Sequence, residues 1–422
     1  MSANRKTLVA GTAALLLLGV VAGTGPAFGL GFALPDQDAF ATARGNAFVA
    51  TANDPAAIFY NPAGISQLDG INVSLGGYGF RWNDFYTGGS GSEYSKAAWS
   101  AAPQVFSTYS LSNYHLSFGL GFYSPYALRS MPWPAQVGFP AILPPYVPSD
   151  QSGRIDYYTL AGMVAWQICP KLSVAAGPTL NYSSINLQDV FSIYAPLPPG
   201  VNFASSFHGD ATCAGYTAGL FFQAAEDHFF GLTYRSATEM NYKGYATGDQ
   251  PFFVGVERNT AASADFHFPE TLAFGYSYRP SDKWNFEADV NWTDWSGLKN
   301  VPLVASPPLP SNDTLDFNWK PSWMLDFGAT RYLPHGWRTS AGYTYSEKSA
   351  SDADYQSWVP DSDRHIFSVG VGKQCGRFSW DAAYQLAWGP PLAIGNNAMT
   401  GVAAGKYEFL GQALTLNVGY HF

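Results

Sequence analysis

The stretch Trp284-Asn285-Phe286-Glu287-Ala288-Asp289-Val290-Asn291-Trp292 alternates without a break between apolar and polar side chains. Successive side chains of a β-strand point to opposite faces, whereas a helix would scatter the two sets around its circumference. The stretch therefore predicts a strand with one apolar, largely aromatic face. The other face carries the polar set, Asn285, Glu287, Asp289 and Asn291.

The same period of two recurs on both sides of this stretch, from Ile71 to Phe422, and predicts fourteen strands. The clearest further cases run from Leu272 to Tyr278 and from Phe378 to Trp388. In each strand we expect the polar or small set to face a lumen and the apolar set to face lipid. The predicted strands cover residues 71–83, 97–110, 114–124, 153–168, 171–188, 209–224, 227–247, 260–280, 282–303, 312–333, 335–350, 362–375, 376–394 and 405–422.

The connections alternate between short turns and longer loops rich in Pro, Gly, Asp and Ser. An even strand number with this alternation is typical of an antiparallel transmembrane β-barrel. A soluble β-sandwich also alternates, but it does not explain an outward aromatic face or strands long enough to cross a bilayer. The short turns are predicted at Leu111-Ser112-Asn113, Cys169-Pro170, Ala225-Glu226, Ser281, Pro334 and Cys375-Gly376.

The composition favours the same fold. Charged residues are 13% of the chain and aromatic residues 16%, whereas soluble domains carry ~25% charged residues. No segment beyond the N-terminus has the ~18 uninterrupted apolar residues of a spanning helix, and a closed barrel is the other structure that satisfies its backbone in lipid.

The first 29 residues resemble a secretory signal peptide. Arg5 and Lys6 precede an apolar run from Leu8 to Val21, and Ala27-Phe28-Gly29 supplies small residues for cleavage. A membrane anchor is the alternative, but the run is short and Gly25-Pro26 follows it. We place the mature start at about Leu30. Without the two basic residues, twenty basic against 31 acidic side chains give a net charge of −11, which argues against a nucleic-acid partner.

Residues 30–70 lack strand periodicity and precede the barrel, which we place at residues 71–422. A segment of this length can fold back into a lumen that would otherwise form an open channel. We therefore interpret it as a plug, or hatch. A disordered leader is the alternative, but several large apolar side chains argue against it: Phe32, Phe40, Phe48, Ile58, Phe59 and Tyr60.

The sequence offers no enzyme motif, so we predict no catalytic residue and no cofactor. It has no Gly-x-Ser-x-Gly elbow, no His-Glu-x-x-His and no phosphate loop. The seven histidines do not stand at metal-ligand spacing, so we predict no metal site. The three cysteines, Cys169, Cys213 and Cys375, form no evident disulfide framework.

Several motifs, in this order and spacing, resemble the FadL-like family of outer-membrane transporters for long-chain fatty acids and aromatic hydrocarbons. The resemblance covers essentially the whole mature chain. The motifs are Leu30-Gly31-Phe32-Ala33-Leu34, Asn53-Asp54-Pro55-Ala56-Ala57 with Asn61-Pro62-Ala63-Gly64, Gly231-Leu232-Thr233-Tyr234-Arg235-Ser236 with Lys243-Gly244, Pro269-Glu270 with Gly275-Tyr276, and Pro360-Asp361-Ser362-Asp363-Arg364.

The resemblance implies a fourteen-stranded barrel with an N-terminal hatch. It also implies capture of ligand between extracellular loops, transfer to an internal apolar pocket, and release sideways near a kink in the third strand. On this basis Asn61, Pro62 and Ala63 belong to the hatch. Gly119, Gly121 and Pro125 would mark the kink, since glycine weakens strand pairing. Ordinary lumen-facing glycines are the alternative.

The predicted loops carry apolar residues that solvated loops seldom have, and such exposed patches usually mark a binding surface. Packing of the loops on one another as a lid is the alternative, and the two are compatible. The candidate ligand contacts are Phe191, Ile193, Phe203, Phe252 and Phe253.

Lys320 shares the parity of Asp326, Gly328 and Thr330 on the tenth predicted strand, which we assign to the lumen. It also aligns with a family lysine that meets a carboxylate headgroup, for which an ammonium is a suitable partner. A lumen lysine paired with Glu287, Asp289 or Asp326 is the alternative. The family's second basic residue is absent here, where Leu187-Gln188-Asp189 stands, so uncharged hydrocarbons fit as well.

Two other functions compete with hydrophobic transport: a general porin for polar solutes and an outer-membrane lipid hydrolase. A porin needs an open charged lumen and no hatch. The expected partners are a hydrophobic ligand, outer-membrane lipid and lipopolysaccharide. The terminal Phe422 ends an alternating strand and resembles the signal that barrel assembly machinery recognises. A lateral exit favours a monomer.

Overall fold

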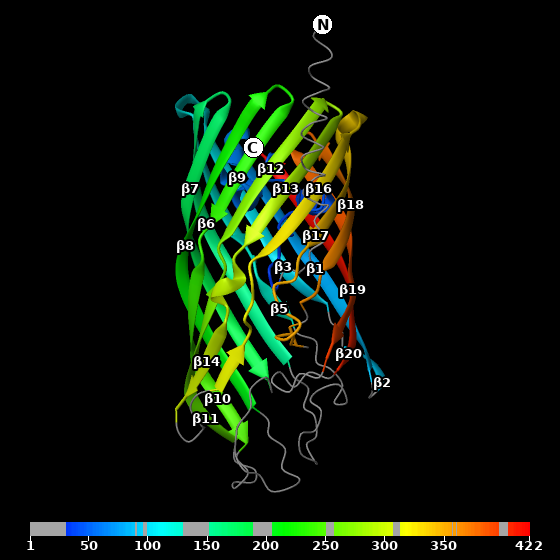
Figure 1. Cartoon of the computed structure of the whole chain (residues 1–422). Coiled ribbons are helices and arrows are strands. Elements are labelled where there is room, and N and C mark those ends of the chain that lie inside the picture. The colour runs from blue at the N-terminus through cyan, green and yellow to red at the C-terminus, as the bar shows by residue number, and fades with distance from the viewer. Residues whose placement is uncertain are drawn as a thin grey trace.

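The computed structural model describes residues 31–88, 91–95, 99–129, 152–188, 205–249, 257–306, 313–356, 358–359, 361–395 and 404–422. The predicted signal peptide lies outside these residues. Most described residues belong to β-strands of one antiparallel sheet (Figure 1).

The sheet closes into a barrel of fourteen strands, as predicted. The barrel closes where β1 pairs with β20, from Asn72↔His421 to Gly88↔Gly405. The strands are β1 (Ile71–Gly88), β2 (Gly91–Tyr94), β3 (Ser100–Leu111), β4 (Leu116–Tyr123), β5 (Ala127–Arg129), β6 (Ser152–Cys169), β7 (Leu172–Gln188), β8 (Ser205–Ala225), β9 (His228–Arg235), β10 (Thr238–Asp249), β11 (Glu257–Phe268), β12 (Thr271–Ser281), β13 (Trp284–Thr293), β14 (Asn300–Ala305), β15 (Asp313–Asp316), β16 (Ser322–Tyr332), β17 (Trp337–Ser346), β18 (Arg364–Cys375), β19 (Phe378–Ile394) and β20 (Gly405–His421).

Six barrel strands are interrupted, so each is formed by two consecutive elements: β2 with β3, β4 with β5, β9 with β10, β11 with β12, β13 with β14, and β15 with β16. The inserted residues project side chains into the interior. Between β13 and β14 the short helix η3 (Trp295–Gly297) buries Trp295 against Phe32 and Trp319, with ring centroids 4.9 and 5.0 Å away.

The alternation in β13 has the predicted orientation. Asn285, Glu287 and Asp289 are buried on the inside, whereas Phe286 faces outward. The last strand shows the same arrangement, with Leu414, Leu416, Val418 and Tyr420 exposed on the outer face. An outer face of exposed apolar and aromatic side chains is what lipid contact requires.

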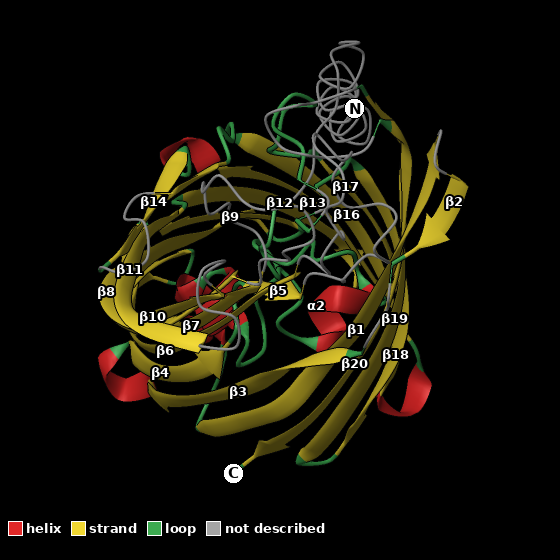
Figure 2. Ribbon diagram, turned by 90° about the horizontal axis from the view of Figure 1, so that it is seen from below, coloured by secondary structure: helices red, strands yellow, loops and turns green. Residues whose placement is uncertain are grey.

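The N-terminal segment, residues 31–70, enters the barrel and crosses its interior (Figure 2). Its helix α2 (Ala39–Ala43) packs against β17, β18, β19 and β20. After α3 (Ala57–Tyr60), the short helix η1 (Pro62–Gln67) packs against β4, β6, β7 and β8 on the other side. Among the described residues, no helix is long and apolar enough to cross a membrane.

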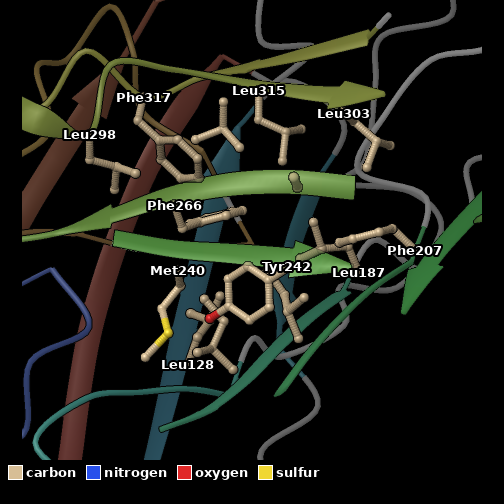
Figure 3. Close-up of a cluster of buried hydrophobic side chains, with 14 of the residues drawn as sticks. Leu128, Leu187, Phe207, Met240, Tyr242, Phe266, Leu298, Leu303, Leu315 and Phe317 are labelled. Carbon is tan, nitrogen blue, oxygen red and sulfur yellow. The ribbon is translucent and has the colours of Figure 1, made fainter. Parts of the chain in front are cut away.

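The lumen is not polar throughout, which corrects the prediction. The inward side chains of β6, β7, β8, β10, β11, β14 and β15 are apolar over the half nearest the long loops (Figure 3). They include Leu187, Phe207, Tyr242, Phe266 and Leu303, and we call this group the outer lumen cluster. Alternation weakens there because both faces are apolar or aromatic. The polar inward residues concentrate where the N-terminal segment lies.

The predicted short turns are found at all six places. Three of them contain a left-handed residue: His115 has φ 55°, His335 has φ 63° and Gly376 has φ 62°. The three cysteines are free, as expected from the sequence.

The outward face yields a test of lipid contact. Val369 lies halfway along β18 with its side chain 56% exposed. An arginine at the bilayer midplane costs ~2–4 kcal/mol, so Val369→Arg should lower the free energy of unfolding in lipid by about that amount. Gln374→Arg, near the short turn, should change it by less than ~1 kcal/mol. Equal effects in urea titrations would contradict the assigned lipid face.

Candidate functional site

Two carboxylates of β13 hold the middle of the N-terminal segment. Asp289 Oδ2 accepts the backbone N–H groups of Phe48 and Val49 at 2.7 and 2.9 Å. Glu287 Oε1 accepts those of Ala50 and Thr51 at 2.6 and 3.1 Å. All these groups are buried. Four irregular backbone donors are thereby satisfied without water.

Arg44 partly offsets the charge of these carboxylates. Its Nη2 lies 3.3 Å from Glu287 Oε2 and 3.0 Å from Asn285 Oδ1. The Arg44 side chain is fully buried. Such a buried ion pair fixes the position of the N-terminal segment but adds little to the free energy of unfolding, because desolvation of both charges is costly. The polar face of β13 is therefore a binding surface for the N-terminal segment.

The start of α2 has a second set of polar contacts. Asp38 is its N-cap and accepts from the N–H groups of Phe40 and Ala41 at 2.7 and 3.0 Å. Asn417 Oδ1 on β20 accepts from Ala39 N at 2.7 Å. Burial raises the pKa of the Asp38 carboxyl to about 6, with Asp381 adding to the rise and Arg338 opposing it.

The predicted hatch residues lie at the join between α3 and η1. Buried Asn61 donates through Nδ2 to the carbonyls of Val49 and Leu220, both at 2.9 Å. Its Oδ1 accepts from Ala63 N at 3.2 Å, and Pro62 is the first residue of η1. One amide therefore ties two parts of the segment to β8. Pro62 and Ala63 are buried.

Gly119 and Gly121 do not bend their strand. β4 keeps an unshifted register with β3 and β6 along its length. A Cβ at either position would lie 2.8–2.9 Å from Ile58. The glycines make room for the N-terminal segment, so the alternative of ordinary lumen-facing glycines is the correct one.

The bend comes after Tyr123, at Ser124–Tyr126, and Pro125 lies within it. The ladder with β3 ends at Gln104↔Tyr123, and β5 pairs with β6 alone. The bent stretch pairs inward instead. Pro125 O accepts from Leu34 N at 2.8 Å, and Ala127 N donates to Phe32 O at 3.0 Å. The third barrel strand, β4 with β5, thus separates from β3 at this point and contacts the N-terminal segment instead.

An internal cavity of about 100 Å³ lies beside this bend. The N-terminal segment contributes Val49, Phe59 and Tyr60 to its lining. Aromatic residues of the wall, Tyr123, Tyr126 and Tyr157, form another side. Hydroxyl and amide side chains line the rest: Thr159, Thr179, Asn181, Thr217, Ser236, Thr238, Thr271, Asn291 and Thr293. Arg235, Met324 and Asp326 complete the chemistry of the wall. The cavity is therefore mixed, not purely apolar.

Lys320 does not face the lumen, which corrects the prediction. β16 begins only at Ser322, and Lys320 is exposed while its neighbour Trp319 enters the outer lumen cluster. The alternation of buried and exposed residues holds through Trp319 and shifts by one residue at Lys320 and Pro321, so the parity of β16 does not extend back to Lys320. No described acidic residue forms an ion pair with Lys320, so the proposed pairing with Glu287, Asp289 or Asp326 is not found.

The predicted loop contacts Phe191, Ile193, Phe203, Phe252 and Phe253 lie outside the described residues. Sequence reasoning missed Arg235 and Trp295. Arg235 stands within the Gly231–Ser236 motif, which could have drawn attention to it. Trp295 follows the break in alternation after Trp292, and that break was the available signal.

The proteins whose sequences are similar to this chain are described as outer membrane or transport proteins. Residues 20–422 match the family described as outer membrane protein transport protein (OMPP1/FadL/TodX). A putative outer membrane protein of Neisseria meningitidis serogroup B is 24% identical over 412 residues, covering 88% of each chain. A long-chain fatty acid transport protein of Escherichia coli O6:H1 is 25% identical over 215 residues, covering 46% of each.

Solved structures show the same fold. A Pseudomonas aeruginosa FadL homologue superposes with a TM-score of 0.78 at 19% identity, covering 93% of this chain and 100% of that one. The Pseudomonas putida toluene transporter TodX gives a TM-score of 0.72 at 15% identity, covering 93% and 100%. At these identities the likeness concerns the barrel itself.

The carboxylates of β13 yield a test of how the N-terminal segment is held. Replacing Glu287 and Asp289 together by Ala should strand four buried N–H groups and Arg44. Because charge-assisted hydrogen bonds contribute ~1.5–3 kcal/mol each, the segment should leave the lumen and conductance in planar bilayers should rise. Glu226→Ala, in a short turn where Glu226 is exposed, is the control. A change of gel mobility on heating will show that the double variant still folds as a barrel. If this folded variant conducts like wild type, these carboxylates do not hold the segment.

Proposed function

The chain belongs to the family of outer membrane transport proteins described as OMPP1/FadL/TodX, and from that membership we propose that it carries hydrophobic small molecules inward. The substrates would be long-chain fatty acids or related hydrocarbons. The barrel and its family place the protein in the outer membrane. The observation that supports the proposal best is the outer lumen cluster, because a channel for polar solutes has a polar interior.

The proposed path starts at the long loops, where Phe191, Ile193, Phe203, Phe252 and Phe253 would capture ligand. It continues along the outer lumen cluster to the internal cavity. Large inward rings such as Phe266 and Phe317, with centroids 5.9 Å apart, offer an apolar surface on the way. A ligand that moves along an apolar lining displaces water from few polar groups, so it avoids the cost of leaving polar groups buried without hydrogen bonds.

The N-terminal segment would act as the hatch of this path. It fills the lumen below the cavity, with Phe48, Ile58 and Tyr60 buried. Asn61, Pro62 and Ala63 would set its position through their contacts with β8. Sideways release beside Pro125 is supported by the ladder that ends at Gln104↔Tyr123, since no register pair joins described β3 residues to β5. The hatch would have to separate from Pro125 for ligand to leave.

A polar-solute channel is the second candidate, and the Glu287 and Asp289 carboxylates are the feature that favours it. Both, however, are occupied by backbone donors of the N-terminal segment. The relatives named above are a fatty acid transport protein and a toluene transporter by their descriptions.

Uptake and conductance together test the proposal. Cells lacking their own hydrophobic-compound transporters should gain uptake of oleate or toluene when they express this chain, and should gain none of sucrose. The purified protein should conduct ions poorly, because the N-terminal segment fills the lumen.

Removal of residues 30–67 should turn this poor conductor into a leaky pore. The same deletion should admit sucrose, since a barrel of this size is then open. Sucrose uptake by the intact chain without gain for oleate or toluene would identify a general porin. Unchanged conductance after the deletion would show that residues 30–67 do not close the lumen.

A further inference from the structure

Arg235 is a half-buried cation, with its Nε fully buried, at the junction between the cavity and the N-terminal segment. It is the last residue of β9 and lines the internal cavity. Its guanidinium carbon lies 3.9 Å from the centroid of the Phe59 ring. Nη2 donates to the Phe59 carbonyl, and Nη1 makes a long contact of 3.4 Å with Thr271 Oγ1. Its known polar partners are thus neutral.

Within the described part of the chain, Arg235 has no carboxylate partner. Its Nε is buried and makes no hydrogen bond. Arg44 and Arg338 differ, because Arg44 pairs with Glu287 at 3.3 Å and Arg338 pairs with Asp381. A buried charge without a counter-charge is costly. The site is therefore short of one anion.

The cavity does not supply that anion itself. Asp326 also lines it, but its two oxygens accept hydrogen bonds from Thr344 and Asn291, both at 2.7 Å. Glu270, between β11 and β12, accepts a hydrogen bond from Tyr234 OH at 2.5 Å. Neither carboxylate forms an ion pair with Arg235. An anion brought in from outside would have the guanidinium to itself.

The size and lining of the cavity restrict what the anion can be attached to. About 100 Å³ is less than the ~150 Å³ of a cavity that takes up one benzene, so the part of a ligand enclosed here must be compact. Aromatic faces from Phe59, Tyr123 and Tyr126 suit a ring, and the hydroxyl wall opposite suits the oxygens of an acid group.

We propose that the internal cavity binds compact hydrophobic monocarboxylates, such as aromatic acids, with the carboxylate on Arg235. This rests on the proposed function and narrows its substrate class. The guanidinium presents a planar pair of donors, and Nε is the one left unsatisfied. Because Nη2 also holds the Phe59 carbonyl next to α3, an occupied site competes for the group that holds the N-terminal segment. Arg235 therefore links the charge of the ligand to the hatch.

Arg279 provides a matched control. Its guanidinium carbon lies 3.9 Å from the Phe229 ring centroid, and Nη2 donates to the carbonyls of Ala50 and Thr51 at 3.3 and 3.4 Å. Its Nε is likewise buried and without a hydrogen bond. Arg279 lines a different cavity, at the end with the short turns. The two arginines hold the same segment in the same manner, but only Arg235 lines the internal cavity.

The test compares benzoate with toluene, a neutral ring of similar size, by calorimetry on the full-length protein in detergent. Arg235→Gln should weaken benzoate binding roughly ten-fold or more and leave toluene binding within about two-fold. Arg235→Lys, which keeps the charge, should restore part of the benzoate affinity. Arg279→Gln should leave the ratio between the two ligands unchanged.

Three results would overturn the inference. One is an equal loss of benzoate and toluene affinity in Arg235→Gln, which would make the residue purely structural. Another is a change of the ligand ratio in Arg279→Gln, which would show that any loosening of the segment has this effect. The third is a wild-type protein that binds toluene but not benzoate, in which case hydrophobic transport stands and the carboxylate site fails. Absence of both binding and uptake would count against the proposed function itself.

Discussion

The structure depends on one constraint: the irregular backbone inside the barrel must find hydrogen-bond partners where no bulk water reaches it. A strand satisfies its neighbours through the ladder, but residues 31–70 form no strand beyond a single bridge at Ala33. Side chains of the wall replace the ladder, above all Glu287 and Asp289. Their burial is acceptable because each accepts backbone donors. The position of the segment, and with it the floor of the cavity, follows from these contacts.

The same constraint explains the composition of the inner wall. Where the N-terminal segment lies, the wall adds polar side chains and glycines to apolar ones, and a Cβ at Gly342 would lie 2.1 Å from the backbone of Arg44. Beyond the segment there is no backbone to satisfy, and the wall becomes the outer lumen cluster. One strand can change character along its length: β6 carries Ala165 against the segment and Ile155 in the cluster. The polar inward side chains of the barrel therefore mark where the backbone of the N-terminal segment needs hydrogen-bond partners.

The sequence predicted the barrel well because alternation and turn residues are local signals. The fourteen strands and six short turns each depend on a few adjacent residues. Lys320 was misplaced because its parity was extrapolated from β16 back across Pro321, where the buried positions change from even to odd numbers. The cavity could not be predicted, since Phe59, Tyr126 and Arg235 come from distant parts of the chain and meet only after the barrel closes. Local periodicity carries no information about such meetings.

Two arginines lie against phenylalanine rings at the N-terminal segment, and this bears on which ligands the protein would prefer. Arg235 and Arg279 each hold carbonyls of the segment and each lie over a phenylalanine ring. Neither has an acidic partner among the described residues, so the segment rests on charges that neutral contacts only partly offset. Only Arg235 lines the internal cavity, so an anion that reaches it there would gain more than a neutral molecule. If Arg235 binds the carboxylate of a ligand as proposed, closure of the lumen and selectivity for ligands with a negative end would depend on the same side chain.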